Sequence, residues 1–233
     1  MNKIKIDKMT KNYNVLLVDD HPIIISAYKQ VFKKVESQNS NLSFKIYEAN
    51  SFIDALNHLK RFNQKRKLHL LLVDLKLAPA PNHNLLSGED LALQVKESFT
   101  EVKIMIATTY HHNYRIHSIF KSLNPDGFLV KGDIDEKEIE HAILDLLEDT
   151  PYYSKTVRNA LRQYVSNDLL LDRLDRQILY ELSQGTKTKD LSNILPLSSA
   201  GIDRRKKRLK EILDVIENDD KTLLQKAKDL GFL

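Results

Sequence analysis

The feature that most constrains the fold is an alternation of short apolar runs with longer amphipathic segments over the first 150 residues. Apolar residues that recur every three or four positions, as from Ile24 to Val35, predict helices with one buried face. Five runs that are apolar nearly throughout predict buried strands. They are Asn14–Val18, Leu42–Tyr47, Leu68–Val73, Val102–Ala107 and Gly127–Val130. Strict alternation of this kind predicts an α/β fold, a doubly wound five-stranded parallel sheet with helices on both faces.

The strand pattern ends near Asp149, and the chain from there to Leu233 has a helical pattern throughout. A Thr-Pro break precedes a segment of helical period, which predicts a linker helix between two domains. The predicted organisation is an N-terminal arm at 1–12, an α/β domain at 13–148, a linker helix at 149–168 and an all-α domain at 169–233.

Composition limits the class of protein. The chain contains no cysteine, so it holds neither a disulfide nor a thiolate metal site. No apolar stretch approaches the roughly 20 residues of a membrane span, and the N-terminus lacks the apolar centre of a signal peptide. We therefore expect a soluble, cytoplasmic protein that does not associate with a membrane.

The charges are unevenly distributed along the chain. Residues 1–150 hold 20 basic and 20 acidic residues, whereas residues 151–233 hold 16 and 12. The excess positive charge therefore lies in the helical part, which predicts an anionic partner for that part.

Polar residues follow four of the predicted strands at the point where each strand ends. Carboxyl ends of parallel strands meet at one edge of a sheet, where ligands of open α/β sheets bind, so these side chains should converge. Several carboxylates without a soft ligand suit a hard cation such as Mg²⁺, and a lysine with a hydroxyl suits a phosphoryl group. The residues are Asp19, Asp20, Asp74, Thr108 and Lys131.

These residues carry a resemblance. Residues 13–148 resemble the receiver domain of two-component response regulators, which have a flavodoxin-like sheet. The likeness rests on "DD" after the first strand, the single aspartate of "LLLVDLKL", the threonine after the fourth strand and the lysine of "FLVK". It implies that a sensor histidine kinase phosphorylates Asp74.

The same resemblance assigns roles to the other residues of the site. Mg²⁺ would bind Asp20 directly and Asp19 mainly through water, with Asp74 and the main-chain carbonyl of Lys76 as further ligands. Thr108 and Lys131 would contact the phosphoryl oxygens. Phe128 stands where this family places an aromatic ring that moves inward on activation, although ordinary core packing explains a phenylalanine there equally well.

Two features depart from the simplest pattern. Three histidines, His21, His111 and His112, have no regular ligand spacing, which favours loop positions facing solvent over a metal site. The loop after Asp74 reaches Gly88 only fourteen residues later, which is longer than usual in the family. Such an insertion either modifies access to the site or is a tolerated surface loop.

The C-terminal part predicts three helices with a tight turn at Gly185, which suits a helix-turn-helix. The third predicted helix has an apolar stripe that includes Ile202 and Leu209, and a basic outer face of the kind that enters a major groove. The stretch Leu171–Leu213 resembles the LuxR/NarL-type DNA-binding domain. By position, that resemblance places Asp203, Arg204 and Lys207 at the bases and Arg205 and Arg208 near the DNA backbone.

The sequence therefore predicts a DNA-binding response regulator and not an enzyme. Its expected partners are a sensor histidine kinase, double-stranded promoter DNA and a second copy of the chain when active, with RNA polymerase a further candidate. One alternative is a transcription factor that works without phosphorylation and uses the receiver as an interaction module. A phosphatase of the haloacid dehalogenase type is disfavoured, because those enzymes usually carry a second aspartate two residues after the nucleophile, where this chain has Lys76.

Overall fold

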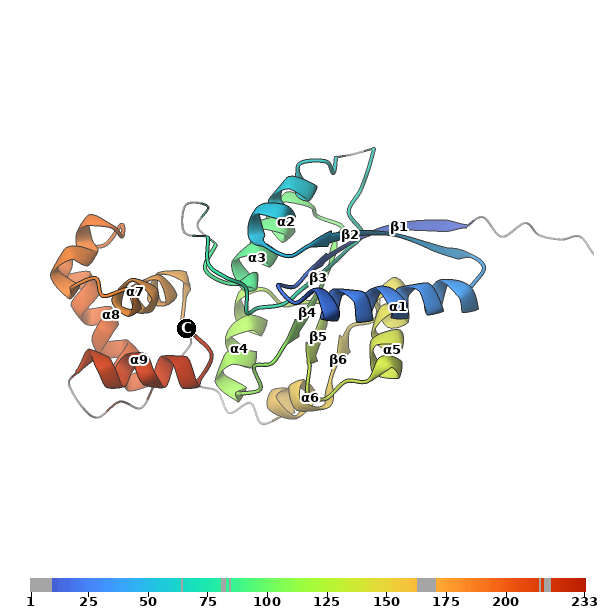
Figure 1. Ribbon diagram of the computed structural model, residues 1–233. Coiled ribbons are helices and arrows are strands. Elements are labelled where there is room, and N and C mark those ends of the chain that lie inside the picture. Colours follow the sequence, from blue (N-terminus) through green and yellow to red (C-terminus); the bar gives the residue numbers. More distant parts are fainter. Residues whose placement is uncertain are drawn as a thin grey trace, which may run out of the picture. The chain divides into compact units, whose positions relative to one another are not determined.

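The computed structural model in Figure 1 describes most of the chain. The predicted arm at 1–12 lies largely outside the described residues, and so do the last residues of the predicted linker helix. The described residues are 10–63, 65–80, 83, 85–162, 171–213, 215 and 219–233.

A single parallel sheet organises the N-terminal part of the chain, and its strands follow the order β2-β1-β3-β4-β5-β6. This order, with the first strand inside the sheet, is that of the flavodoxin-like doubly wound fold. The strands are β1 (Lys11–Val18), β2 (Leu42–Ala49), β3 (Leu70–Val73), β4 (Lys103–Thr108), β5 (Gly127–Val130) and β6 (Tyr152–Tyr153). The predicted fold class is confirmed, and the five predicted strands are all present.

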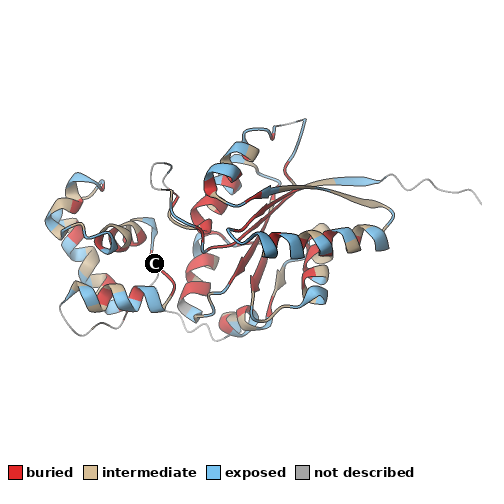
Figure 2. Ribbon diagram, in the orientation of Figure 1, coloured by how far each residue is buried: buried red, intermediate tan, exposed pale blue. Residues whose placement is uncertain are grey.

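Helices cover both faces of this sheet. Helices α1 and α5 share one core with β1, β3, β4 and β5, and Figure 1 shows α2 and α3 on the opposite face. Burial of both faces explains why the middle strands are apolar throughout, since every residue of β3 and β5 is buried (Figure 2). The helices are α1 (Pro22–Gln38), α2 (Phe52–Leu59), α3 (Gly88–Ser98) and α5 (Glu136–Leu147).

The predicted strand count was wrong, because a sixth strand, β6, pairs in parallel with β5. Phe128 lies beside Tyr153 in this pairing. Since β6 falls inside the predicted linker helix at 149–168, the helix begins only at Lys155, as α6 (Lys155–Arg162). A strand of two residues is too short to show a period of two, so only the β-preference of its tyrosines pointed to it.

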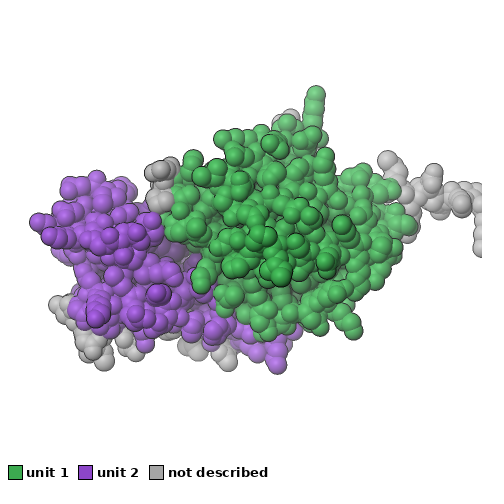
Figure 3. Space-filling model, viewed as in Figure 1, with its two compact units in different colours: residues 1–109, 125–154 green, residues 110–124, 155–233 purple. Residues whose placement is uncertain are grey.

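The chain packs as two compact units (Figure 3). Unit 1 comprises residues 1–109 and 125–154, and unit 2 comprises residues 110–124 and 155–233. Helix α4 (Asn113–Ser122) therefore groups with the C-terminal helices. The predicted boundaries at 13–148 and 169–233 divide the chain differently and remain predictions.

The C-terminal helices of unit 2 enclose an apolar core of their own, which includes Ile178, Leu191 and Leu209. The predicted second helix is a short 3₁₀ helix. In the part of the chain that the structure describes, no helix has both the length and the apolar character needed to cross a membrane. The elements are α7 (Arg173–Ser183), the 3₁₀ helix η2 (Thr188–Asn193), α8 (Ser199–Ile212) and α9 (Asp220–Asp229).

Candidate functional site

Strand register brings the first two acids of the site together. In the pairing of β1 with β3, Val18 lies beside Val73, so Asp19 and Asp74 follow at the same level of the carboxyl edge. The amide of Asp74 donates to the carbonyl of Val18 over 2.9 Å, which extends the pairing by one residue. The two carboxylates are separated by 55 positions in the chain and are adjacent in the fold.

The pairing of β4 with β5 sets the other side of the site. Thr108 lies beside Val130, and the amide of Lys131 donates to the carbonyl of Thr108 over 2.7 Å. Thr108 is fully buried at the end of β4. Phe128 is also fully buried, so in this conformation its ring is already directed into the protein.

The centre of the site is an ion triad. The Lys131 ammonium lies 2.7 Å from Asp19 Oδ2 and 2.7 Å from Asp74 Oδ2. All three side chains are secluded, with 14% of Lys131, 1% of Asp19 and 4% of Asp74 exposed. Charge-assisted hydrogen bonds of this length are strong, so the lysine holds two carboxylates that would otherwise repel each other.

Burial and the triad change the protonation behaviour of the site. Burial raises the pKa of Asp74 above its ordinary value and outweighs the opposing effect of Lys131. Burial tends to lower the pKa of Lys131, but its hydrogen bonds to Asp19 and Asp74 dominate and the pKa is raised. The pKa of the nearby Tyr28 phenol is raised, first by burial and then by the two negative charges.

A third acid and a histidine occupy the open side of the site. Asp20 is 38% exposed, and its Oδ1 lies 2.7 Å from Nδ1 of His21. The same ring nitrogen lies 3.2 Å from Asp19 Oδ1, and the His21 amide donates to that oxygen over 3.0 Å. His21 was predicted to face solvent. It is 64% exposed, yet its ring is directed at the acid pair.

The acids fit a divalent cation. One carboxylate oxygen of Asp19, one of Asp20 and a ring nitrogen of His21 lie within 4.8 Å of one another. Three carboxylates and one ammonium leave the site with a net charge of about −2 when all are ionised. Carboxylate oxygens with this surplus charge are the donors that Mg²⁺ prefers, so the predicted ligands Asp19, Asp20 and Asp74 fit that ion.

The segment after β3 closes tightly on Asp74. The Lys76 amide donates to Asp74 Oδ1 over 3.1 Å, and a metal contact by the Lys76 carbonyl remains a prediction. A Cβ on Gly88, the first residue of α3, would lie only 1.9 Å from the main-chain oxygen of Asp74. The sequence marked Gly88 only as the residue that the loop after Asp74 reaches, because nothing local reveals this close approach.

Helix α8 separates its charged residues between solvent and the interior. Asp203, Arg204 and Lys207, the three positions predicted at the bases, are exposed. Lys206 is 13% exposed and donates to Asp220 and to Thr188, so its ammonium is paired although the side chain lies largely within the fold. The exposed residues form the outer face that the sequence predicted.

The two arginines predicted near the DNA backbone contact helix α7. Arg205 Nη1 lies 2.7 Å from Asp172 Oδ2 and 2.7 Å from Asp175 Oδ1, and Arg208 Nη1 lies 3.4 Å from Asp175 Oδ2. Asp175 is fully buried, so these contacts compensate an interior charge. Backbone contacts by Arg205 and Arg208 remain predictions, and the carboxylates compete for them.

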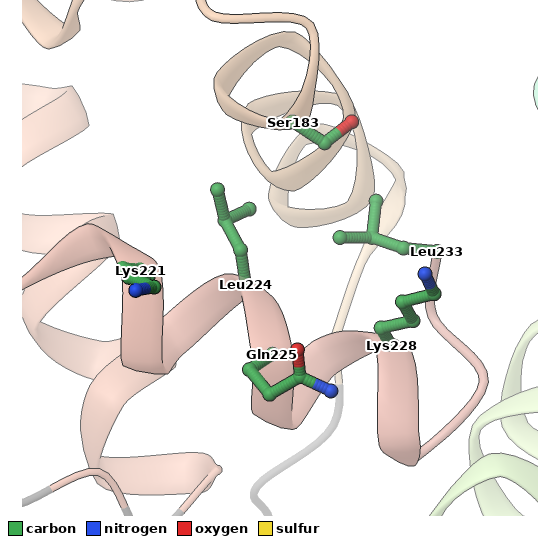
Figure 4. Close-up of a pocket in the computed structure, with 6 residues that line it drawn as sticks. All are labelled: Ser183, Lys221, Leu224, Gln225, Lys228 and Leu233. Carbon is green, nitrogen blue, oxygen red and sulfur yellow. The ribbon is translucent and has the colours of Figure 1, made fainter.

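A pocket of about 560 Å³ lies between α7 and α9 (Figure 4). Lys221, Leu224 and Lys228 line it from α9. The hydroxyl of Ser183 already donates to the carbonyl of Tyr180 over 2.6 Å. Mixed aliphatic and flexible cationic side chains do not define a ligand, so we assign none.

No protein-family model matches this sequence, and no curated protein is detected as a relative. Solved structures do match. RcsB from Salmonella enterica serovar Typhimurium, bound to the promoter rprA with the phosphomimetic BeF3⁻, has a TM-score of 0.65 at 22% identity over 94% of this chain and 99% of that chain. RcsB bound to the promoter P1flhDC gives 0.64 at 19% identity over 94% and 100%. The chain has the fold of a response regulator.

A structure of a single domain is matched as well. The isolated REC domain of Salmonella RcsB has a TM-score of 0.51 at 22% identity, and the match covers 64% of this chain and 99% of that domain. Identities this low establish the fold alone. They confirm the fold expected from the resemblance and leave the roles of the individual residues as predictions.

Proposed function

We propose that this chain is a DNA-binding response regulator of the LuxR/NarL type, phosphorylated on Asp74 by a sensor histidine kinase in an Mg²⁺-dependent reaction. The observation that carries the proposal is the Lys131 ammonium held between Asp19 and Asp74, with Asp20 on the open side. The fold shared with RcsB, which has been solved with promoter DNA and BeF3⁻, supports it. We place the protein in the cytoplasm.

In this proposal Asp74 is the nucleophile. A carboxylate oxygen of Asp74 attacks the phosphorus, an O–P bond forms, and the bond from phosphorus to the donor breaks, releasing the imidazole of a phosphohistidine or the acetate of acetyl phosphate. Bound Mg²⁺ would supply positive charge against the phosphoryl oxygens. Asp19, Asp20 and Asp74 would hold that ion, with the carbonyl of Lys76 as a further ligand.

Lys131 changes partners in the reaction. Its ammonium lies between Asp19 and Asp74 before transfer and offsets one of their two charges, and it would contact a phosphoryl oxygen afterwards. The hydroxyl of Thr108, at the end of the neighbouring strand, would donate to another oxygen. Phe128 lies on β5 and Lys131 directly follows that strand, so a shift of β5 would also repack the Phe128 ring.

The output in this proposal is DNA binding by α8. Asp203, Arg204 and Lys207 are exposed together on its outer face, where they can reach base edges in a major groove. Arg205 and Arg208 are the residues predicted to contact DNA phosphates, so the affinity for DNA should fall steeply as the salt concentration rises. Phosphorylation would promote dimerisation and promoter binding, with RNA polymerase as a further partner.

Labelling with acetyl phosphate tests the phosphoacceptor. Asp74→Asn should abolish stable labelling in the presence of Mg²⁺, whereas Asp54→Asn, which changes an exposed acid of α2, should label like the wild type. Labelling of the Asp74→Asn protein at the wild-type rate would refute the assignment.

DNA binding distinguishes the alternative, a transcription factor that works without phosphorylation. We expect the affinity for a duplex selected by the protein from a random pool to rise when BeF3⁻ and Mg²⁺ are added. Equal affinity with and without BeF3⁻ would favour the alternative.

A further inference from the structure

Ser154 lies at the junction between the sheet and the linker. It follows directly after β6, and α6 begins at the next residue, Lys155. The side chain is fully buried, which is unusual for a serine unless its hydroxyl is satisfied. Its amide donates to the carbonyl of Phe128 over 3.0 Å, so its main chain continues the pairing of β6 with β5.

The hydroxyl of Ser154 is hydrogen-bonded on both sides of Lys131. It accepts from the amide of Val130 over 3.1 Å and donates to Asp133 Oδ2 over 2.8 Å. The amide of Asp133 in turn donates to the carbonyl of Val130 over 2.8 Å, which closes the turn. One hydroxyl thus holds both ends of the turn from which the Lys131 ammonium projects.

We propose that Ser154 is a positioning residue, which holds Lys131 against the phosphoacceptor Asp74 and couples this site to the linker α6. The inference rests on the proposed function and adds a regulatory contact to it. If Lys131 moves when it takes up a phosphoryl oxygen, the turn moves with it and the bonds of Ser154 change. Because α6 begins at the residue after Ser154, a change in the hydrogen bonds of Ser154 acts directly on the first residue of the linker.

Coupling of this kind is reciprocal. If phosphoryl binding changes the affinity for DNA by a given factor, then DNA binding through the helices that follow α6 must change the affinity for the phosphoryl group by the same factor. Removal of the Ser154 hydroxyl should therefore reduce both the effect of phosphoryl binding on DNA affinity and the effect of DNA binding on phosphoryl affinity. A purely structural serine would instead lower stability and leave the ratio of the two affinities unchanged.

The test compares full-length Ser154→Ala with Tyr153→Phe. The control removes a hydroxyl from the same short strand, where Tyr153 donates to the carbonyl of Pro125. Two quantities are measured with Mg²⁺ present: the dissociation constant for BeF3⁻, and the ratio of affinities for a selected duplex with and without BeF3⁻. Asp133→Ala, which removes the hydroxyl's acceptor, serves as a second variant should Ser154→Ala fail to fold.

We expect Ser154→Ala to weaken BeF3⁻ binding by about 5- to 30-fold, the effect of losing one or two kcal/mol from buried hydrogen bonds, and to move the affinity ratio toward one. Asp133→Ala should act in the same direction, and Tyr153→Phe should stay within about twofold of the wild type. The inference is overturned if both variants keep the wild-type constant and ratio, or if Tyr153→Phe changes them equally.

Failure of the proposed function has a different signature. It would appear as a wild-type protein that binds no BeF3⁻. Amide hydrogen exchange of Lys131, whose amide donates to the carbonyl of Thr108, then decides the positioning role, because faster exchange in Ser154→Ala supports it and unchanged exchange overturns it.

Discussion

Replacement of Lys131 by methionine should destabilise the protein in a way that depends on pH and Mg²⁺. The ammonium lies 2.7 Å from each of two secluded carboxylates, Asp19 and Asp74. Methionine retains much of the aliphatic volume of the side chain and removes its charge. The variant would therefore hold two like charges near each other in the interior with no cation between them.

The magnitude follows from the burial of the triad. Removal of one partner of a buried ion pair typically costs about 3–5 kcal/mol, because the remaining charge is left uncompensated. Lys131 retains 14% exposure and water reaches the Asp20 side, so we expect the lower end, about 3 kcal/mol above neutral pH. Added Mg²⁺ should recover part of this loss by binding the folded state.

The pH dependence has a defined sign. The pKa of Asp74 is raised by burial, so its contribution to stability is fully present below the ordinary aspartate range and is lost as pH rises through the raised value. Without Lys131, which lowers this pKa, that loss should occur at higher pH. The difference between the variant and the wild type should therefore shrink as the solution is made more acidic.

Urea unfolding without metal, repeated at several pH values and then with Mg²⁺, measures these effects. Lys137→Met, at an exposed lysine of α5, is the control and should change stability by less than about 0.5 kcal/mol. A loss below about 1 kcal/mol for Lys131→Met near pH 8, independent of pH and Mg²⁺, would refute the reasoning.

Other predictions follow from the same contacts. Gly88→Ala should destabilise the protein by about 1–3 kcal/mol and slow acetyl phosphate labelling, since the added Cβ would clash with the Asp74 carbonyl. An unchanged urea midpoint together with an unchanged labelling rate would contradict this. The rate of labelling should increase as the pH rises through the raised pKa of Asp74, because the carboxylate is the attacking form. A labelling rate that no longer increases above the ordinary aspartate pKa would contradict this prediction. Asp175→Ala should cost about 1–2 kcal/mol in unfolding, because Arg205 keeps Asp172 as a partner while α7 loses the carboxylate that accepts from the Asp172 amide; a neutral effect would contradict the pairing. Lys207→Ala should weaken binding to the selected duplex by about 1–3 kcal/mol and relax the sequence preference, and an equal loss of affinity for an unrelated duplex would exclude a base contact.

Local patterns in the chain were enough to predict much of the fold. Continuous apolar runs such as Leu70–Val73 occur where a strand is buried on both faces, and that burial is the rule in parallel sheets. Because carboxyl ends of parallel strands share one edge, the convergence of Asp19 with Asp74 and Lys131 followed from topology without any coordinates. The strand β6 escaped prediction, because two residues carry no periodicity.

By itself the sequence determined the class of fold, the edge of the sheet at which the acids meet, and the basic outer face of α8, since each depends on residue type and period within short windows. Only the tertiary structure decided which groups are paired: Lys131 with two acids, His21 with the open side of the site, Arg205 with Asp175, and Ser154 with the turn beside Lys131. These partners lie far apart in the chain or depend on side-chain direction. Their contacts therefore arise from register and packing, which no local pattern encodes.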